Sequence, residues 1–275
     1  MSKFEAIYRR RSVRDYSSKS LPKEELAAIE DDIDDLDPLY DDIGSKMILA
    51  ENGEKVQKTF SGLTSKVARV DAPHYLIGVS DEEDGYPENM GYMLEDAVLY
   101  LTEKGIGTCW VGAGIGHDLL KDLFDHERNT VILVAFGDSV PDKSNLRKNP
   151  RSASRKDLED LMIDDDHLPK EVKKIIDAAR MAPSAINSQP WRFSYEDGEI
   201  QVYLEKKGMF KKLVRKIGDL DMLNHIDIGI ALKHLEIGAL NYSKDIRFLD
   251  REKKRRGYEY ITSVHLEGPG SSKAH

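Results

Sequence analysis

Apolar residues recur at helical spacing in two segments that begin alike, LPKEELAAIEDDI from Leu21 and LPKEVKKIIDAAR from Leu168. Each segment has a proline near its start, acidic residues in its first turn, and apolar residues three and four positions apart. This pattern predicts an amphipathic helix in each place. Four common residues such as LPKE also recur by chance, so the repeat needs support from the elements that follow it.

Two further segments, residues 93–107 and 225–240, are apolar on nearly all sides and predict buried central helices. A strand-like run precedes each of them, at residues 72–79 and 200–205. Two strand-like runs follow each helix: TCWVG and residues 130–137 in the first case, IRFL and residues 258–266 in the second.

The order helix, strand, helix, strand, strand therefore occurs twice along the chain. It predicts an α+β fold made of two half-domains, residues 1–155 and 156–275, with the polar stretch 138–155 as the crossover. Two such halves would pack most simply as an imitation of a two-fold dimer within one chain. We therefore expect a monomer, with further association left open.

Composition and charge limit the class of protein, its cellular location and its partners. The chain has 275 residues, 40% of them hydrophobic, which is enough for a sizeable core. Its one cysteine, Cys109, excludes an intramolecular disulfide. With no secretion signal or membrane span expected, the cytoplasm is the predicted location. The net charge of -9 argues against general nucleic-acid binding, although the basic run 251–256 keeps that alternative open.

The most informative segment of the first half is RRRSVRDY, which follows a short predicted helix. If the chain is extended after that helix, Arg10, Ser12 and Arg14 project to the same side. Two guanidinium groups and a hydroxyl then suit a phosphate monoester. The alternative is a basic helix end whose charges complement the helix dipole.

Its counterpart in the second half is residues 182–191, APSAINSQPW, directly after the second amphipathic helix. Pro183 and Pro190 restrict the backbone at both ends. Between them Ser184, Asn187 and Gln189 offer hydroxyl and amide groups that read the edge of a polar heterocycle without adding charge. A plain turn is the alternative interpretation.

Taken together, RRRSVRDY, APSAINSQPWRF and GIGTCWVG resemble the motifs of the FMN-dependent nitroreductase family. In that family FMN lies at a homodimer interface, between the basic motif of one subunit and the PSxxNxQPW loop of the other. Here the two motifs lie far apart in one chain, which resembles a tandem branch whose two degenerate halves mimic the dimer. Residues 35–44 stand where the first half would have the PSxxN loop, and residues 154–161 where the second would have RRSVR. The resemblance therefore implies one flavin site and a nitroreductase-like fold.

The resemblance also assigns roles to single residues. It implies contacts to the phosphate, the ribityl chain and the N1/O2 edge from the basic motif, and closure over the ring by the proline-bracketed loop. It implies a backbone segment near flavin N5 and O4, and a late basic pair that completes the phosphate clamp. The basic motif comprises Arg10, Arg11, Ser12 and Arg14, and the loop residues are Pro183, Ser184, Ala185, Asn187 and Gln189. The backbone segment is Trp110, Val111 and Gly112. The late basic pair is Arg155 with Lys156, for which Arg147 and Lys148 are the alternative.

The activity that the resemblance implies is reduction of FMN by NAD(P)H, followed by transfer to an electron-poor small molecule in a ping-pong cycle. Nitroaromatics, quinones and enones are the expected acceptors. No catalytic side chain is required, because flavin N5 carries the chemistry. No metal is expected, since the histidines lack paired ligand spacing. The alternative function is an FMN-binding protein without efficient turnover.

Overall fold

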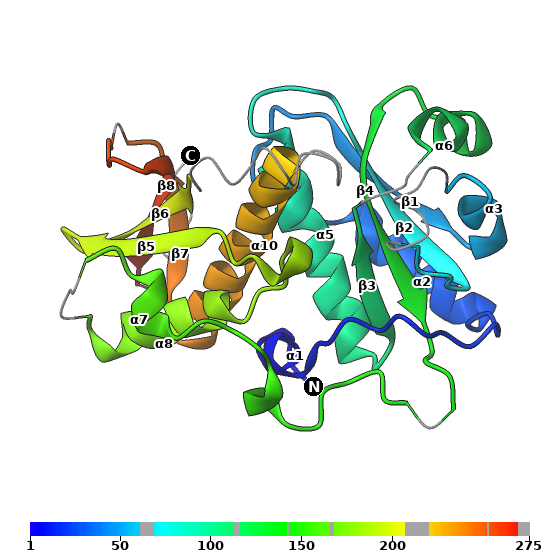
Figure 1. Cartoon of the computed structure of the whole chain (residues 1–275), viewed down its shortest axis with the longest axis horizontal. Helices are drawn as coiled ribbons and strands as arrows, with labels where there is room; N and C mark the ends of the chain where they lie inside the picture. The colour runs from blue at the N-terminus through cyan, green and yellow to red at the C-terminus, as the bar shows by residue number, and fades with distance from the viewer. Residues whose placement is uncertain are drawn as a thin grey trace.

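The computed structural model describes residues 1–60, 69–112, 116–141, 143–164, 168–206, 220–251 and 253–268. Two four-stranded antiparallel sheets lie at opposite ends of the molecule. The long helices α5 (Tyr86–Glu103) and α10 (Leu220–Asn241) lie between them (Figure 1). Within the described ranges, no helix has the length and apolarity needed to cross a membrane.

The remaining elements follow one another in a repeated order. The first half contains α1 (Lys3–Arg9), α2 (Lys23–Asp34), β1 (Ser45–Ala50), α3 (Gly53–Gln57), β2 (His74–Ser80), then α5, β3 (Gly107–Val111), α6 (His117–Phe124) and β4 (Asn129–Gly137). The second contains η1 (Pro150–Ser152), α7 (Leu158–Leu161), α8 (Lys170–Arg180), η2 (Ala185–Asn187), β5 (Trp191–Glu196), β6 (Glu199–Glu205), then α10, β7 (Asp245–Leu249) and β8 (Tyr258–Glu267).

The two sheets have the same strand order and the same irregularity. The first runs β1-β2-β4-β3 and the second β5-β6-β8-β7. In the first sheet the register shifts between Gly78 and Val79, and in the second between Val202 and Tyr203. One shift lies in the pairing of β2 with β4 and the other in the pairing of β6 with β8. Each leaves one extra residue in the later strand, β4 or β8. The repeated order predicted from the sequence is therefore matched by a repeated register.

The central helices touch at two glycines in a reciprocal way. A Cβ on Gly91 of α5 would lie 2.1 Å from the carbonyl oxygen of Ile226, and one on Gly229 of α10 would lie 2.0 Å from that of Glu88. Only glycine allows two helix backbones to approach this closely. Contacts that exchange partners in this way are what a two-fold axis between the halves produces.

The predicted helices and strands are confirmed, with changes at their boundaries. Helix α5 begins at Tyr86 and ends at Glu103, whereas the apolar pattern placed it at residues 93–107. The chain turns at Gly105, whose φ is +83°, before β3 begins at Gly107. Strands β1 and β5 were not predicted, because β1 alternates weakly and Trp191 was assigned to the preceding loop. The division of the chain at residue 155 stays a prediction.

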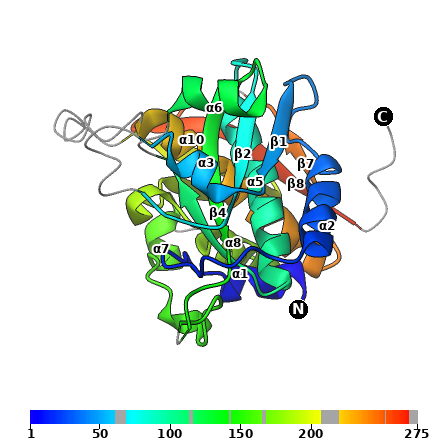
Figure 2. The same cartoon turned by 90° about the vertical axis from the view of Figure 1, so that its right-hand side faces the viewer.

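Helix α1 belongs to the first half in sequence but packs on the second half as well. Ala6 and Ile7 lie in one apolar cluster with Ala178 and Met181 of the second half. The Phe4 ring meets the Tyr242 ring edge to face. Figure 2 shows α1 below α5 and α8. The basic motif that follows α1 is thereby delivered to the junction between the halves.

Candidate functional site

The basic motif leaves α1 in an extended conformation. Helix α1 ends at Arg9, and Arg10 caps it with φ −58° and ψ 138°. Ser12 then forms a parallel bridge with Thr108 of β3, and the Val13 N–H donates to the Thr108 carbonyl at 2.9 Å. The segment therefore runs along the outer edge of the first sheet, as an extended chain after the helix requires.

Arg10 is a buried cation, and two of its three guanidinium nitrogens lack hydrogen-bonding partners among the described residues. Its side chain is 3% exposed, and within the described structure Nε and Nη1 make no hydrogen bond. The Arg10 Nε lies 4.0 Å from the nearest carboxylate oxygen, Oε1 of Glu95. Burial lowers the pKa of Arg10. An unpaired buried charge is costly for a folded protein, so this guanidinium is suited to meet an anion.

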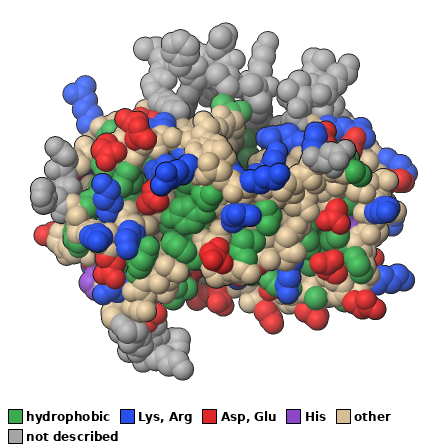
Figure 3. Space-filling model, turned by 90° about the horizontal axis from the view of Figure 1, so that it is seen from below, with side chains coloured by type: hydrophobic (Ala, Val, Ile, Leu, Met, Phe, Trp, Pro, Cys, Tyr) green, Lys and Arg blue, Asp and Glu red, His purple; other side chains and the backbone are tan. Residues whose placement is uncertain are grey.

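Two more arginines lie close to Arg10. The Arg147 N–H donates to the Arg9 carbonyl at 2.7 Å, which brings the crossover segment against the end of α1. Burial and the charge of Arg10 lower the pKa of Arg147. Burial, then Arg10 and Arg147, lower the pKa of Arg155 to about 10. Figure 3 shows Lys and Arg side chains on the face seen from below, where α1 and η1 lie. We call Arg10, Arg147 and Arg155 the arginine cluster.

Arg155 connects this cluster to the proline-bracketed loop. Its Nη1 donates to Oδ1 of Asn187 at 3.1 Å, and its Nε and Nη2 donate to the Met181 carbonyl at 3.3 and 3.1 Å. The Asn187 amide in turn donates to the Ser154 carbonyl at 3.2 Å. Motifs that are distant in sequence thus meet at one place.

The loop holds an unusual backbone conformation. Ile186, Asn187 and Gln189 have φ values of +49°, +57° and +48°. A left-handed backbone is unfavourable for a β-branched residue such as Ile186, so other contacts must hold it. Asp227 of α10 does so: its carboxylate accepts the Ala185 N–H at 3.0 and 3.1 Å and the Ser188 hydroxyl at 3.4 Å.

The burial of Asp227 has a second effect. It raises the pKa of this carboxyl group well above its usual value, although the donors from Ala185 and Ser188 favour the ionised form. The loop is therefore anchored by a buried carboxyl group of α10.

Gln189 and Lys156 brace the loop from the inside. Gln189 is 3% exposed, and its Oε1 accepts the Lys156 N–H at 2.8 Å. Its Nε2 donates to the Asn187 carbonyl at 3.3 Å, while its own N–H donates to Oγ of Ser184 at 2.9 Å. These contacts explain why an amide and a hydroxyl occur at these positions: they stabilise the loop itself.

The end of β3 packs against both central helices. The Trp110 indole N–H donates to Oε2 of Glu95 at 3.0 Å, and Val111 is buried. A Cβ on Gly112 would lie 2.7 Å from Cδ2 of Leu223, so only glycine fits without displacing that side chain of α10. The first turns of α10 therefore pack against the backbone that follows Trp110.

The other predicted residues occupy more peripheral positions. Arg11 and Arg14 are exposed, Ser12 is half-buried and hydrogen-bonds to Cys109, and Pro183 is buried. Burial raises the pKa of the Cys109 thiol. The structure brings Arg10, Arg155 and Asn187 together and adds Arg147, which the sequence offered only as an alternative. Glu95, His234 and Asp227 were not predicted to take part in the site; each is a buried ionisable residue of a central helix.

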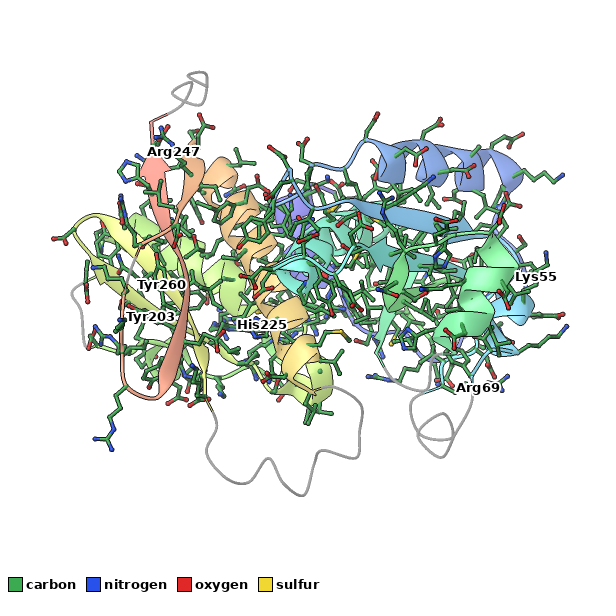
Figure 4. All side chains as sticks on the ribbon, turned by 90° about the horizontal axis from the view of Figure 1, so that it is seen from above. Lys55, Arg69, Tyr203, His225, Arg247 and Tyr260 are labelled. Carbon is green, nitrogen blue, oxygen red and sulfur yellow. The ribbon has the colours of Figure 1, made fainter. Side chains whose placement is uncertain are left out.

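A pocket of about 640 Å³ lies at the corresponding place in the other half. It is bounded by Tyr40, by the start of α5, and by the chain after β7 at Asp250. The equivalent elements at the first site are the 183–190 loop, the start of α10 and the chain after β3. Asn89 of α5 accepts the N–H groups of Leu39 and Tyr40 at 2.7 and 3.0 Å, as Asp227 does for the other loop. Figure 4 labels His225 of this pocket, on α10, and Tyr260, on β8.

This second pocket has the opposite electrostatic character. Five carboxylates line it, and its described lining contains no lysine or arginine. The carboxylates belong to Glu83, Asp84, Glu88, Asp250 and Glu259. Glu88 is engaged by His225. An anion that suits the arginine cluster would be repelled here.

Comparisons with known proteins identify the family and support the fold. The chain matches the family described as "Putative TM nitroreductase" over residues 3–239. A nitroreductase structure from Thermotoga maritima is similar with a TM-score of 0.62 and 22% identity, over 97% of this chain and 93% of that one. A Bacteroides fragilis nitroreductase solved with bound FMN matches with a TM-score of 0.45 and 18% identity, over 57% of this chain and 99% of that one. A search of curated proteins found no match.

Proposed function

Because this chain belongs to the nitroreductase family that matches residues 3–239, we propose that it is an FMN-dependent oxidoreductase. In this proposal NADH or NADPH supplies the electrons and an electron-poor small molecule, such as a nitroaromatic, a quinone or an enone, receives them. The observation that carries the proposal is the buried Arg10 guanidinium, which lies beside Arg147 and Arg155 and has two nitrogens without a hydrogen-bond partner in the part of the chain that the structure describes.

These residues fit the phosphate of FMN. A phosphate monoester carries about two negative charges near neutral pH and accepts hydrogen bonds from guanidinium groups in paired geometry. Arg10 and Arg155 would hold it directly, with Arg147 and the exposed Arg11 and Arg14 adding positive potential. The pKa of Arg155 is lowered by burial and then by the charges of Arg10 and Arg147, and an anion among these arginines would relieve that repulsion.

The ring of FMN fits between the end of β3 and the proline-bracketed loop. In this proposal the backbone of Trp110, Val111 and Gly112 would face one side of the ring and Ser184, Ala185 and Asn187 the other, with the buried Pro183 supporting the loop. Gln189 and Lys156 act on this side by holding the loop. The exposed Ile186 side chain, 75% accessible, offers an apolar surface for an aromatic acceptor.

The chain's own residues would position the reactants and set the local charge. FMN, when bound, supplies the hydride chemistry at its N5 atom. The positive potential of the basic motif favours negative charge at the N1/O2 edge, and the backbone after Trp110 orients the ring. No acid, base or nucleophile from the protein is needed, so NAD(P)H and the acceptor can use the same face in turn.

A visible absorption spectrum followed by a donor titration tests the proposal. We expect the purified or FMN-reconstituted protein to be yellow and to bleach anaerobically with NADH or NADPH. Addition of a quinone should restore the colour and allow repeated oxidation of the donor. A protein that binds FMN but bleaches with neither donor would be the alternative, an FMN-binding protein without turnover. A protein that stays colourless on reconstitution would contradict both.

We further propose that residues 1–155 and 156–275 are the two halves of an internal pseudo-dimer that works as a cytoplasmic monomer. The matching strand order and the reciprocal glycine contacts of α5 and α10 support it. A small-molecule acceptor is the only proposed partner. Arg251 and Lys253 of the basic run are paired with Glu199 and Glu196, which reduces the charge available to a nucleic acid.

A further inference from the structure

A buried hydrogen-bonded pair, Glu95 and His234, joins the two central helices beside the arginine cluster. Both side chains are 0% exposed. The Nε2 of His234, on α10, lies 2.9 Å from Oε1 of Glu95, on α5. The other carboxylate oxygen accepts the Trp110 indole N–H at 3.0 Å. Arg10, with Nε at 4.0 Å, completes the surroundings of this carboxyl group.

The hydrogen-bond partners determine how many protons the pair holds. The Nδ1 of His234 lies 3.0 Å from the Ala178 carbonyl, which only accepts, so Nδ1 carries a proton. Nε2 then faces a carboxyl oxygen. If His234 were neutral and Glu95 ionised, two acceptors would face each other in the buried core. A proton must therefore lie between Nε2 and Oε1, on one atom or the other.

Either location of that proton gives the pair the same net charge. An imidazolium with a carboxylate and an imidazole with a carboxylic acid both sum to zero. Glu95 therefore does not neutralise Arg10, although it is the nearest carboxylate. A neutral pair also explains why Arg10 Nε stays 4.0 Å away and makes no hydrogen bond.

We propose that the Glu95–His234 pair holds one shared proton and so keeps the positive charge of Arg10 available for an anionic ligand. Both are positioning residues, because they act on the ligand through Arg10. The same carboxyl group fixes Trp110, so the wall of the ring site and the phosphate cation are set by one buried unit. For FMN as the ligand, the inference rests on the proposed function; for a simple phosphate anion it does not.

Three variants separate the charge of the pair from its packing. In His234→Gln the transferable proton is lost, Glu95 becomes an anion beside Arg10, and we expect FMN to bind about tenfold more weakly. Glu95→Gln keeps the pair neutral: its amide donates to Nε2 of His234 and its carbonyl accepts from Trp110. Its FMN affinity should stay within about threefold of the wild type. The double variant should recover most of the affinity lost in His234→Gln.

The measurements are FMN titration by fluorescence quenching and, independently, the rise in melting temperature caused by inorganic phosphate. His265→Gln, at a half-exposed histidine of β8, is the matched control and should change neither. The inference is overturned if His234→Gln binds both ligands like the wild type, or if the double variant binds no better than His234→Gln.

Three further outcomes are also decisive. If His234→Gln does not fold, the Glu95→Gln variant is decisive. If Glu95 is an anion paired to Arg10 in the wild type, Glu95→Gln should bind FMN about tenfold more tightly. If the Glu95–His234 pair is neutral, the affinity should stay within about threefold of the wild type. If the wild type is stabilised by phosphate but binds no FMN, the proposed function fails while the inference is still tested. If the wild type responds to neither ligand, both are contradicted.

Discussion

The two halves of this protein share a backbone plan but differ in the charges placed upon it. At the first site, Asp227 holds a loop whose Asn187 meets the arginine cluster. At the corresponding site, Asn89 holds the loop at Tyr40, and carboxylates line the pocket. A duplicated fold therefore keeps its strand register and its loop anchor in both copies. The ligand site depends instead on a few side chains that packing does not dictate.

The same contrast appears on the central helices. Gly91 and Gly229 are equivalent in the reciprocal helix contact, which makes Glu95 of α5 equivalent to Lys233 of α10, each four residues further on. Lys233 is 3% exposed, and its Nζ lies 2.7 Å from Glu236, 3.4 Å from Asp96 and 3.7 Å from the centre of the Tyr92 ring. Lys233 is thus closely paired within the fold, whereas two nitrogens of Arg10 make no hydrogen bond within the described structure.

Replacing the unpaired cation should break the first site. Arg10→Met fills the buried volume without charge, and we expect FMN affinity to fall at least ~1,000-fold, about 4 kcal/mol. The ligand-free protein should keep its stability or gain about 1 kcal/mol, because a buried charge without a partner is removed. Fluorescence titration and urea unfolding measure the two effects. The exposed Arg151→Met is the control, and equal FMN binding by both variants would refute the assignment.

Replacing the paired cation should do the reverse. Lys233→Met removes the cation that pairs with Glu236 and leaves Asp96 with Lys3 alone, so we expect a loss of about 3 kcal/mol in the free energy of unfolding. FMN affinity of the folded fraction should stay within about twofold, since the charge of Lys233 does not face the arginine cluster. Urea unfolding with and without FMN tests this. A Lys233→Met variant with normal stability but weakened FMN binding would contradict the assignment of Lys233 to stability and of Arg10 to FMN binding.

Removing the loop anchor should cost less. In Asp227→Ala the Ala185 N–H and the Ser188 hydroxyl lose their acceptor, and we expect a loss of about 2 kcal/mol in stability together with weaker FMN binding. Asp227→Asn introduces the residue type that anchors the other loop and should be nearly neutral near pH 5. Chemical unfolding of both variants makes the comparison, and an equal loss in the two would show that the anchor requires a carboxylate.

Asp227 also predicts a pH dependence. Its pKa is raised in the folded state, so the folded protein holds this proton more tightly than the unfolded chain does. Its contribution is therefore most favourable below about pH 4 and is lost as the pH rises toward the raised value. The stability of Asp227→Asn relative to the wild type should accordingly increase from pH 5 to pH 8. A constant difference across that range would contradict the shift.

The smallest effect concerns backbone strain in the loop. Ile186 has φ +49° and a side chain that is 75% exposed, so little packing compensates its left-handed backbone. Ile186→Asn should raise the free energy of unfolding by about 1 kcal/mol, because asparagine tolerates this conformation. Leu123→Asn, at an exposed position of helix α6, serves as the control and should not stabilise the protein. Differential scanning calorimetry measures both.

The sequence predicted most of the fold because hydrophobic period and helix starts are local properties. The repeated LPKE helices and the apolar central helices required no knowledge of contacts. Strands β1 and β5 were missed, since a six-residue segment such as Ser45–Ala50 gains its structure from pairing with β2. The reciprocal contact at Gly91 and Gly229 was also out of reach, because it depends on which helices face each other.

The candidate site divides in the same way. Arg10 and the 183–190 loop were found because their residue types are unusual for a helix end and a turn. The choice between Arg147 and Arg155 was not decidable from the chain, and the structure places both near Arg10. Glu95 and His234 could not be singled out from the sequence, because other ionisable residues, among them Asp96 and Lys233, lie on the same two helices. Their protonation follows only from contacts across two helices.

The number of FMN molecules bound per chain tests the central claim most directly. Equilibrium titration of the ligand-free protein, with protein concentration fixed by amino-acid analysis, should saturate at one FMN per chain, because among the described residues the arginine cluster lies at one of the two equivalent sites and carboxylates line the other. A stoichiometry of two would show that the acidic pocket accepts the same ligand, and a stoichiometry of zero would show that the arginine cluster does not select it.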